Sequence, residues 1–257
     1  MSNGVELGCG LIAIGREWGT TPSVPDESNA LRFLEAAYEL GVRFFDTAPS
    51  YGLSEQRLGL FLSHLTPSER KGVRVATKFG ERWDATTNTA YTDHSVDSLK
   101  RSLDRSLQLV GSIAVLQLHK TTPELLESDE ISEAFDYAKR TGVGAFGASV
   151  SDVASADKAL HDGRLSFVQL PYNLMSTQFE PVVKDSLTAG KQLIINRPLL
   201  MGEATAHVEQ EEKDAAIDSA FTFILQEDFK GVVLTGTANV NHLHENWQAF
   251  LRVQATL

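Results

Sequence analysis

The sequence predicts an α/β fold, a (β/α)8 TIM barrel that forms a single domain over residues 1–257. A chain of 257 residues is typical of one such barrel and does not require a second domain. Short apolar runs alternate with longer amphipathic segments, which is the element order of that barrel. An open doubly wound sheet uses the same alternation. However, no GxGxxG fingerprint with an acid about 20 residues further on follows an early strand, so the barrel is favoured.

Eight short runs are the candidate strands. They are rich in Val, Ile, Leu and Phe, as expected for strands that are covered on both faces. The runs occupy residues 7–15, 42–46, 73–79, 113–119, 143–149, 166–172, 192–198 and 231–236.

The segments between these runs have helical periodicity. In residues 27–40, Ala30, Phe33 and Leu34 lie on one stripe, and Gly41 is the expected stop. A second helix begins near the TDHS segment, where leucines recur at helical spacing. Besides 27–40, the expected helices are 93–109, 129–140, 152–161, 179–189, 211–226 and 239–253.

Composition excludes several classes of protein. A net charge of −11 disfavours a nucleic-acid partner, which requires a basic face. The single cysteine rules out an internal disulfide. No apolar run is long enough for a membrane span, and residues 1–8 do not resemble a signal peptide. We therefore expect a cytoplasmic protein that binds neither nucleic acid nor a membrane.

Polar residues follow three neighbouring strands at the point where each one ends. Asp46 ends the second candidate strand, Lys78 the third and His119 the fourth, and Tyr51 lies on the loop after Asp46. In a (β/α)8 barrel these strand ends form one rim, where catalytic groups gather. Each residue alone is more often a cap, a rim charge or a structural histidine. Together they favour a catalytic site on that rim.

Seven motifs then follow in order: FFDTAPSYGLSEQRLG, VATKFG, VLQLHK, GAFGASVSD, FVQLPYN, RPLLMG and GTANVNHLHEN. They cover nearly the whole chain. Together they resemble the motifs of the aldo-keto reductases, and the chain resembles a short, bacterial-type member of that family. The resemblance implies an NAD(P)H-dependent oxidoreductase that reduces an aldehyde or ketone, or oxidises an alcohol or sugar hydroxyl. By motif position, it makes Asp46, Tyr51, Lys78 and His119 the catalytic tetrad.

This tetrad has a physical rationale. A free tyrosine, with a pKa near 10, exchanges protons poorly at neutral pH. We expect the Lys78 ammonium to lower the Tyr51 pKa, and Asp46 to keep Lys78 charged and in place. His119 is expected to orient the substrate oxygen and to share the proton.

The same resemblance implies the cofactor contacts. Ser149 and Gln169 are expected to bind the nicotinamide carboxamide. Asn196 stands where many members have a stacking aromatic ring, and Arg197 is expected to reach the pyrophosphate, with Leu199 in the Pro-Leu segment beside it. Segment 236–246 holds the residues expected at the adenosine phosphate, which are Gly236, Thr237, Asn239, His242 and Asn246.

Segment 236–246 also bears on the choice of cofactor, because it contains no Lys or Arg. Backbone amides at the start of helix 239–253 are expected to help bind an anion. We expect NADP(H) to be favoured by less than is usual in the family, with NAD(H) also possible. His242 and His244 do not share a helix face, so we expect no metal site.

Other features and functions stay open on sequence alone. Trp83, in residues 80–88, is expected either to wall the substrate pocket or to pack on a loop, and the short C-terminus predicts an open site. One alternative function is a non-catalytic, nicotinamide-binding regulatory module. A less favoured one is a Schiff-base aldolase that uses Lys78. The exact substrate, the preferred direction and the oligomeric state are not specified.

Overall fold

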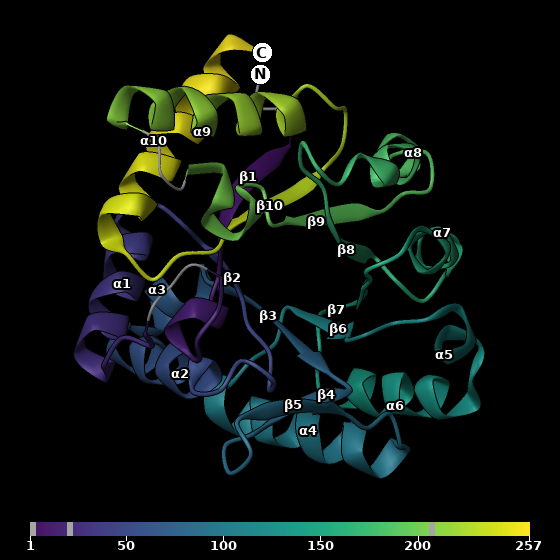
Figure 1. The fold of residues 1–257 in the computed structure, drawn as a ribbon. Coiled ribbons are helices and arrows are strands. Elements are labelled where there is room, and N and C mark those ends of the chain that lie inside the picture. Colours follow the sequence, from purple (N-terminus) through teal and green to yellow (C-terminus); the bar gives the residue numbers. More distant parts are fainter. Residues whose placement is uncertain (1–3, 20–22, 206–208) are drawn as a thin grey trace.

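The computed structural model describes residues 4–19, 23–205 and 209–257. Parallel strands close into an eight-membered barrel in the order β1-β10-β9-β8-β7-β6-β3-β2, which confirms the predicted fold class (Figure 1). The strands are β1 (Val5–Gly10), β2 (Phe44–Asp46), β3 (Arg74–Phe79), β6 (Val115–Leu118), β7 (Ala145–Ser149), β8 (Phe167–Pro171), β9 (Gln192–Asn196) and β10 (Gly231–Thr235).

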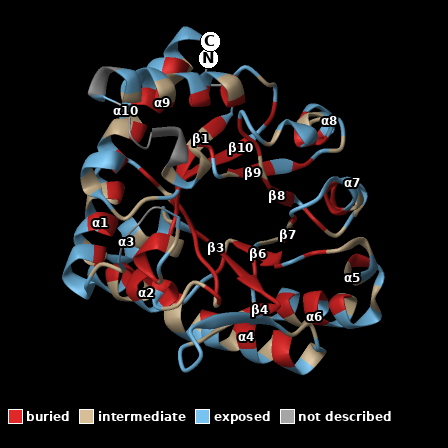
Figure 2. Ribbon diagram, in the orientation of Figure 1, coloured by how far each residue is buried: buried red, intermediate tan, exposed pale blue. Residues whose placement is uncertain are grey.

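Helices surround this ring and turn their buried faces towards it, while their outer faces are exposed (Figure 2). The main apolar core lies between the helices and the outward-facing strand residues, such as Phe45 and Val75. The helices are α1 (Glu27–Glu39), α2 (Ser54–His64), α3 (Pro67–Lys71), α4 (Val96–Val110), α5 (Pro123–Glu127), α6 (Asp129–Arg140), α7 (Val153–His161), α8 (Glu180–Asp185), α9 (Gln210–Leu225) and α10 (Val240–Thr256). Among the described residues, no helix is both long and apolar enough to cross a bilayer.

Three predicted elements differ from the structure. The apolar run 7–15 leaves the sheet at Gly10 and continues as a 3-10 turn, η1 (Ile12–Ile14). The predicted helix 179–189 is only the short α8, which the 3-10 turn η2 (Thr177–Phe179) precedes. Segment 80–88, for which no strand was predicted, contributes to an antiparallel hairpin of β4 (Glu81–Asp84) and β5 (Thr89–Thr92). Asp84 closes that hairpin by accepting a 2.8 Å hydrogen bond from the Thr86 amide.

The barrel interior changes from apolar to polar along the strands. A smaller core cluster contains Phe44, Ala76, Val115, Phe167 and Ile194. Side chains in a strand alternate between faces, so the residue two positions later points to the same side. Those later residues are Asp46, Lys78, Gln117, Gln169 and Asn196. The apolar layer therefore forms a floor beneath a ring of polar side chains at the C-terminal end of the barrel.

Candidate active site

A buried ion pair occupies the middle of this polar ring. Lys78 Nζ donates to Asp46 Oδ2 at 2.6 Å and to the Thr47 carbonyl oxygen at 3.0 Å. The other carboxylate oxygen, Asp46 Oδ1, accepts a 2.9 Å hydrogen bond from Gln117 Nε2. The Lys78 side chain is 0% exposed and that of Asp46 is 2% exposed. Because both carboxylate oxygens have donors, the burial of this pair is compensated.

Two closely packed turns set the position of Tyr51 above the pair. The Gly15 carbonyl accepts from the Leu53 amide at 3.0 Å, and a Cβ added at Gly15 would lie 1.8 Å from the Tyr51 carbonyl oxygen. Gly52 has φ +60°, and a Cβ there would lie 2.3 Å from the Gly15 oxygen. Only glycine permits this approach. It leaves the Tyr51 ring centroid 4.8 Å from Lys78 Nζ.

The pKa of Tyr51 differs from the sequence-based expectation. We expected Lys78 to lower the pKa of Tyr51, but the pKa of Tyr51 is raised because burial outweighs the nearby ammonium. Burial alone lowers the pKa of Lys78, but the charge of Asp46, and then Tyr51, reverses that effect, so the Lys78 pKa is raised. At neutral pH the site therefore holds a protonated phenol beside a charged ammonium.

His119 lies at the rim, edge-on to Tyr51, with their ring centroids 6.2 Å apart. Its Nδ1 lies 3.2 Å from Glu81 Oε2 and 3.5 Å from Ser50 Oγ. Burial, followed by the charge of Lys78, holds the pKa of His119 well below its ordinary value, so the imidazole is neutral at pH 7. A neutral ring that carries its proton on Nδ1, the nitrogen next to the Glu81 carboxylate, keeps Nε2 as a proton acceptor.

These residues open onto a cavity of about 760 Å³. That volume lies within the range of small-molecule sites, about 300–1,000 Å³. Two predicted site residues do not line it: Lys78 is buried behind Tyr51, and Trp83 stacks beneath Arg16 instead of walling the cavity. The predicted residues that do line it are Asp46, Tyr51, His119, Ser149, Gln169, Asn196, Arg197, Leu199, Gly236, Thr237, Asn239, His242 and Asn246.

The cavity offers unfilled polar groups that match a nicotinamide. Gln169 Oε1 and Asn196 Oδ1 are buried and have no hydrogen-bond partner among the described residues. A carboxamide NH2 group is the kind of donor that such oxygens require. Gly236 adds open space, since nothing lies within 4 Å of a Cβ built on it. Arg197 follows Asn196 in a left-handed backbone conformation with φ 57°. The residues present therefore fit a nicotinamide cofactor.

The opposite end of the cavity differs from the expectation for an adenosine phosphate. We expected backbone amides at the start of α10 to bind an anion, but Asn239 Oδ1 already accepts from the amides of Asn241 and His242, at 2.8 and 3.3 Å. Thr237 Oγ1 is likewise engaged by the Asn239 amide at 3.0 Å. Lys213 of α9 also lines the cavity, with Nζ 2.6 Å from Glu245 Oε2. Segment 236–246, which contains no Lys or Arg, thus has Lys213 of α9 beside it.

Sequence reasoning missed several polar residues that line or support this site. Arg16 and Trp18 come from the loop after η1, and Glu81 begins the hairpin β4–β5. Gln117 was inside a predicted strand, where its period-two relation to His119 indicates that it shares the inward face. The other three residues carried no local signal, because their neighbours lie far away in the sequence.

Comparison with known proteins gives a consistent result. The sequence model of the Aldo/keto reductase family matches residues 6–219. YqkF of Bacillus subtilis (strain 168), described as an uncharacterized oxidoreductase, is 26% identical over 278 residues, which cover 95% of this chain and 86% of that protein. A D-threo-aldose 1-dehydrogenase of a Pseudomonas species is 39% identical over 101 residues, which cover 35% of this chain and 30% of that enzyme. The solved structure of aldo-keto reductase AKR11C1 from Bacillus halodurans, in its holo form, matches with a TM-score of 0.78 and 22% identity, and covers 95% of this chain and 86% of that one. The last match supports the fold.

Proposed function

We propose that this chain, which belongs to the aldo/keto reductase family, interconverts an aldehyde or ketone and the corresponding alcohol or sugar hydroxyl with a nicotinamide cofactor. The observation that carries the proposal is the buried Asp46–Lys78 pair, which lies beneath Tyr51 and next to His119 at one cavity. The cofactor, when bound, supplies or accepts the hydride. The protein must then place the carbonyl and move one proton.

The proton chemistry is assigned to Tyr51. In the reduction direction its hydroxyl gives a proton to the carbonyl oxygen, and the adjacent Lys78 ammonium stabilises the phenolate that results. Asp46 keeps Lys78 charged and fixed. When an alcohol is oxidised, the Tyr51 phenolate takes the hydroxyl proton back, and His119, with Nε2 available as an acceptor, orients that hydroxyl.

The nicotinamide is assigned to the part of the cavity near Ser149, Gln169 and Asn196. Gln169 Oε1 and Asn196 Oδ1 are the buried oxygens available to a carboxamide. Arg197, from the same end of β9, is assigned to the pyrophosphate.

We further propose that NADP(H) is preferred over NAD(H), by a modest factor. Lys213 and His242 are the nearby groups that can carry positive charge towards a 2′-phosphate. Lys213 is partly neutralised by Glu245, and the first amides of α10 are capped by Asn239. The ratio of NADPH and NADH dissociation constants tests this: Lys213→Gln should weaken NADPH binding and leave NADH binding unchanged. Equal binding of both cofactors by the wild type would contradict the preference.

The Schiff-base alternative is not supported by the geometry. An imine-forming lysine must lose its proton, whereas Asp46 and Tyr51 raise the pKa of Lys78 and its Nζ is enclosed by oxygen partners.

The test of the proposed function is Tyr51→Phe, which keeps the ring and removes the hydroxyl. We expect turnover of aldehydes with NADPH to fall by roughly 10²–10⁴-fold, the usual contribution of a general acid, with cofactor affinity unchanged. Tyr91→Phe is the matched control, because Tyr91 is exposed on β5 and does not line the cavity. If Tyr51→Phe turns over as fast as the wild type, the role of Tyr51 is wrong. If the wild type binds NADPH but reduces no carbonyl, the regulatory alternative is favoured.

A further inference from the structure

Arg16 lies close to Tyr51 because its loop packs on the Tyr51 turn. The contact between Gly15 and the Leu53 amide joins the two loops directly beside Arg16. Arg16 also lines the cavity that Tyr51, Glu81 and His119 share. Its guanidinium is near enough to Glu81 and Tyr51 to interact with both electrostatically. Arg16 therefore belongs to the substrate end of the cavity.

The Arg16 guanidinium is held by two aromatic rings. Its Cζ lies 5.2 Å from the ring centroid of Trp18 and 4.7 Å from that of Trp83. Arginine commonly stacks on tryptophan faces in this way, which fixes the plane of the guanidinium and leaves its N–H edges available. This stack accounts for Trp83, which the sequence placed near the pocket and which supports Arg16 from behind.

One N–H group of Arg16 has no acceptor among the described residues. Arg16 Nε is buried and has no hydrogen-bond partner in the described part of the chain, and no ion pair of Arg16 is formed there either. The nearby acid, Glu81, directs Oε2 to His119 Nδ1 at 3.2 Å and Oε1 to Lys120 Nζ at 3.6 Å. A buried N–H without an acceptor costs free energy, so this arrangement suits a ligand that brings its own acceptor.

The sign of charge around the cavity is consistent with such a ligand. The whole chain has a net charge of −11, yet the cations among the described lining residues outnumber the acids. The cations are Arg16, Arg32, Lys120, Arg197 and Lys213, and the acids are Asp46, Glu81 and Glu245. Asp46 and Glu245 are paired with Lys78 and Lys213, and Arg197 is assigned to the cofactor, which leaves Arg16, Arg32 and Lys120 against Glu81. An acidic protein with a cationic cavity attracts anions to that cavity selectively.

We propose that Arg16, held between Trp18 and Trp83, forms a substrate subsite for an anionic oxyacid group, so that the preferred substrates are carbonyl compounds that carry a carboxylate or a phosphate. The planar fork of arginine matches both groups by two parallel N–H···O bonds. This inference rests on the proposed function, because it assigns the non-reacting end of the same substrate. Arg197, whose Cζ lies 5.7 Å from the same Trp18 ring, is left to the cofactor.

The kinetic test uses matched pairs of aldehydes. 4-Carboxybenzaldehyde is compared with its methyl ester, and D-glyceraldehyde 3-phosphate with D-glyceraldehyde. We expect the wild type to prefer one anionic member by about 10–100-fold in kcat/KM, mostly through KM, as expected for charge-assisted hydrogen bonds. The pair with the larger preference identifies carboxylate or phosphate as the group recognised. Arg16→Met should remove the preference and change the neutral members less than about threefold, while Arg16→Lys should retain only part of it because the fork is lost.

Arg74→Gln is the matched control. Arg74 also stacks on an aromatic ring, that of Phe44, and it pairs with Glu6 on β1, at the N-terminal end of the barrel. Arg74→Gln removes one positive charge, as Arg16→Met does, without altering the cavity. We expect the preference of this variant for anionic substrates to equal that of the wild type. Thermal unfolding of all variants verifies that they are folded.

A binding experiment without turnover separates this inference from the proposed function. Calorimetric titration of the protein with 4-(hydroxymethyl)benzoate and with benzyl alcohol should show tighter binding of the anion, and Arg16→Met should abolish the difference. This readout applies even if the protein reduces no aldehyde, in which case the proposed function fails and the subsite stands. The subsite would be overturned if Arg16→Met lost activity equally on anionic and neutral substrates, or if it lost affinity for NADPH. It would also be overturned if the wild type showed no preference for the anionic substrates.

Discussion

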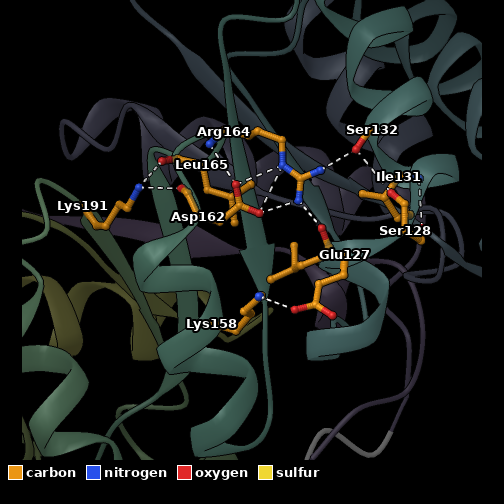
Figure 3. A network of polar contacts seen from close by, with 10 residues as sticks. Glu127, Ser128, Ile131, Ser132, Lys158, Asp162, Arg164, Leu165 and Lys191 are labelled. Atoms are coloured by element: carbon orange, nitrogen blue, oxygen red, sulfur yellow. Dashed lines mark hydrogen bonds and ion pairs between the residues drawn. The ribbon is translucent and has the colours of Figure 1, made fainter.

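Two polar regions, one buried and one partly buried, lie at opposite ends of this barrel, and each contains a buried lysine. At the N-terminal end, the Arg164 cluster consists of Asp162, Arg164, Lys191 and Ser132 (Figure 3). Arg164 donates Nε to Asp162 Oδ1 at 3.0 Å and a terminal nitrogen to Ser132 Oγ at 2.8 Å. Lys191 Nζ donates to the carbonyl oxygens of Asp162 and Leu165, at 2.8 and 2.7 Å.

The polar ring at the C-terminal end is less complete. Beside the fully bonded Asp46–Lys78 pair, unpartnered buried atoms occur on Gln169, Asn196 and Arg16. In the Arg164 cluster, none of the described side-chain atoms is buried without a partner. Buried polar groups normally find partners within the protein. The Arg164 cluster therefore serves the fold by joining α5, α6 and the starts of β8 and β9, whereas the polar ring retains buried polar atoms without a partner among the described residues, as the proposed ligand site requires.

The largest expected contrast is between the two lysines. Lys78→Met should reduce turnover by roughly 10²–10⁴-fold, because the Tyr51 phenolate loses its ammonium and the pKa of Tyr51 rises further. It should also lower the free energy of unfolding by about 3–5 kcal/mol, since Asp46 is left buried and unpaired. Steady-state kinetics and denaturant unfolding measure the two effects.

Lys191→Met is the matched control, since it also removes a buried ammonium. Burial lowers the pKa of Lys191, and its partners are backbone carbonyls. We expect a loss of about 1–3 kcal/mol in the free energy of unfolding, with kcat unchanged. Equal losses of turnover in both lysine variants would contradict the division between the two ends.

The second prediction concerns Arg164→Met, which should affect stability alone. Arg164 joins Asp162, Ser132 and the carbonyl oxygen of Leu126. Hydrogen bonds to charged groups contribute about 1.5–3 kcal/mol, so we expect a loss of that size in urea unfolding with kcat/KM unchanged. Arg252→Met, which removes an exposed pair with Asp218, should cost less than about 1 kcal/mol. A fall in kcat/KM for Arg164→Met would show that the two ends are coupled.

Most of the fold was predictable because local patterns encode it. Strands covered on both faces are mostly apolar, which makes them visible in the sequence. Phe44 and Asp46 lie two positions apart, which is the period of a strand, so the sequence shows that they point in the same direction. The position of Asp46, Lys78 and His119 at one rim follows from parallel strands alone.

The rest of the site depends on contacts between distant segments. Arg16 contacts Trp83, which lies 67 positions away in the sequence, and Arg16 lies beside Tyr51 because the turns at Gly15 and Gly52 pack closely. Lys213 reaches Glu245 by helix packing between α9 and α10. The pKa of Tyr51 was expected in the wrong direction because the sequence reveals the nearby lysine but does not reveal the extent of burial. Local periodicity carries none of this information.

A smaller effect is expected for Glu81, which positions His119 and is not itself one of the four proposed catalytic residues. Glu81→Ala removes the carboxylate that lies 3.2 Å from His119 Nδ1, and we expect kcat to fall about tenfold, since a loss of about 1.4 kcal/mol has that effect on a rate. Glu81→Gln keeps an acceptor oxygen and should recover most of the loss. If both variants equal the wild type in kcat, Ser50 alone suffices to orient the ring.

The smallest expected effect is a pH dependence within the Arg164 cluster. Burial alone would raise the pKa of Asp162, but the hydrogen bonds from Arg164 outweigh it and the pKa is lowered. A carboxyl group whose pKa is lowered in the folded state stabilises the protein fully above its unfolded value of about 3.9, and this contribution is lost as the pH falls through the lower folded value. The stability difference between the wild type and Arg164→Met should therefore be constant from pH 7 to about 5 and shrink by about 1 kcal/mol towards pH 2. Urea unfolding of both proteins over that range measures it, with Arg252→Met as the reference for an exposed pair. A difference that is independent of pH would mean that Arg164 acts through Ser132 and the Leu126 carbonyl and not through the Asp162 carboxylate.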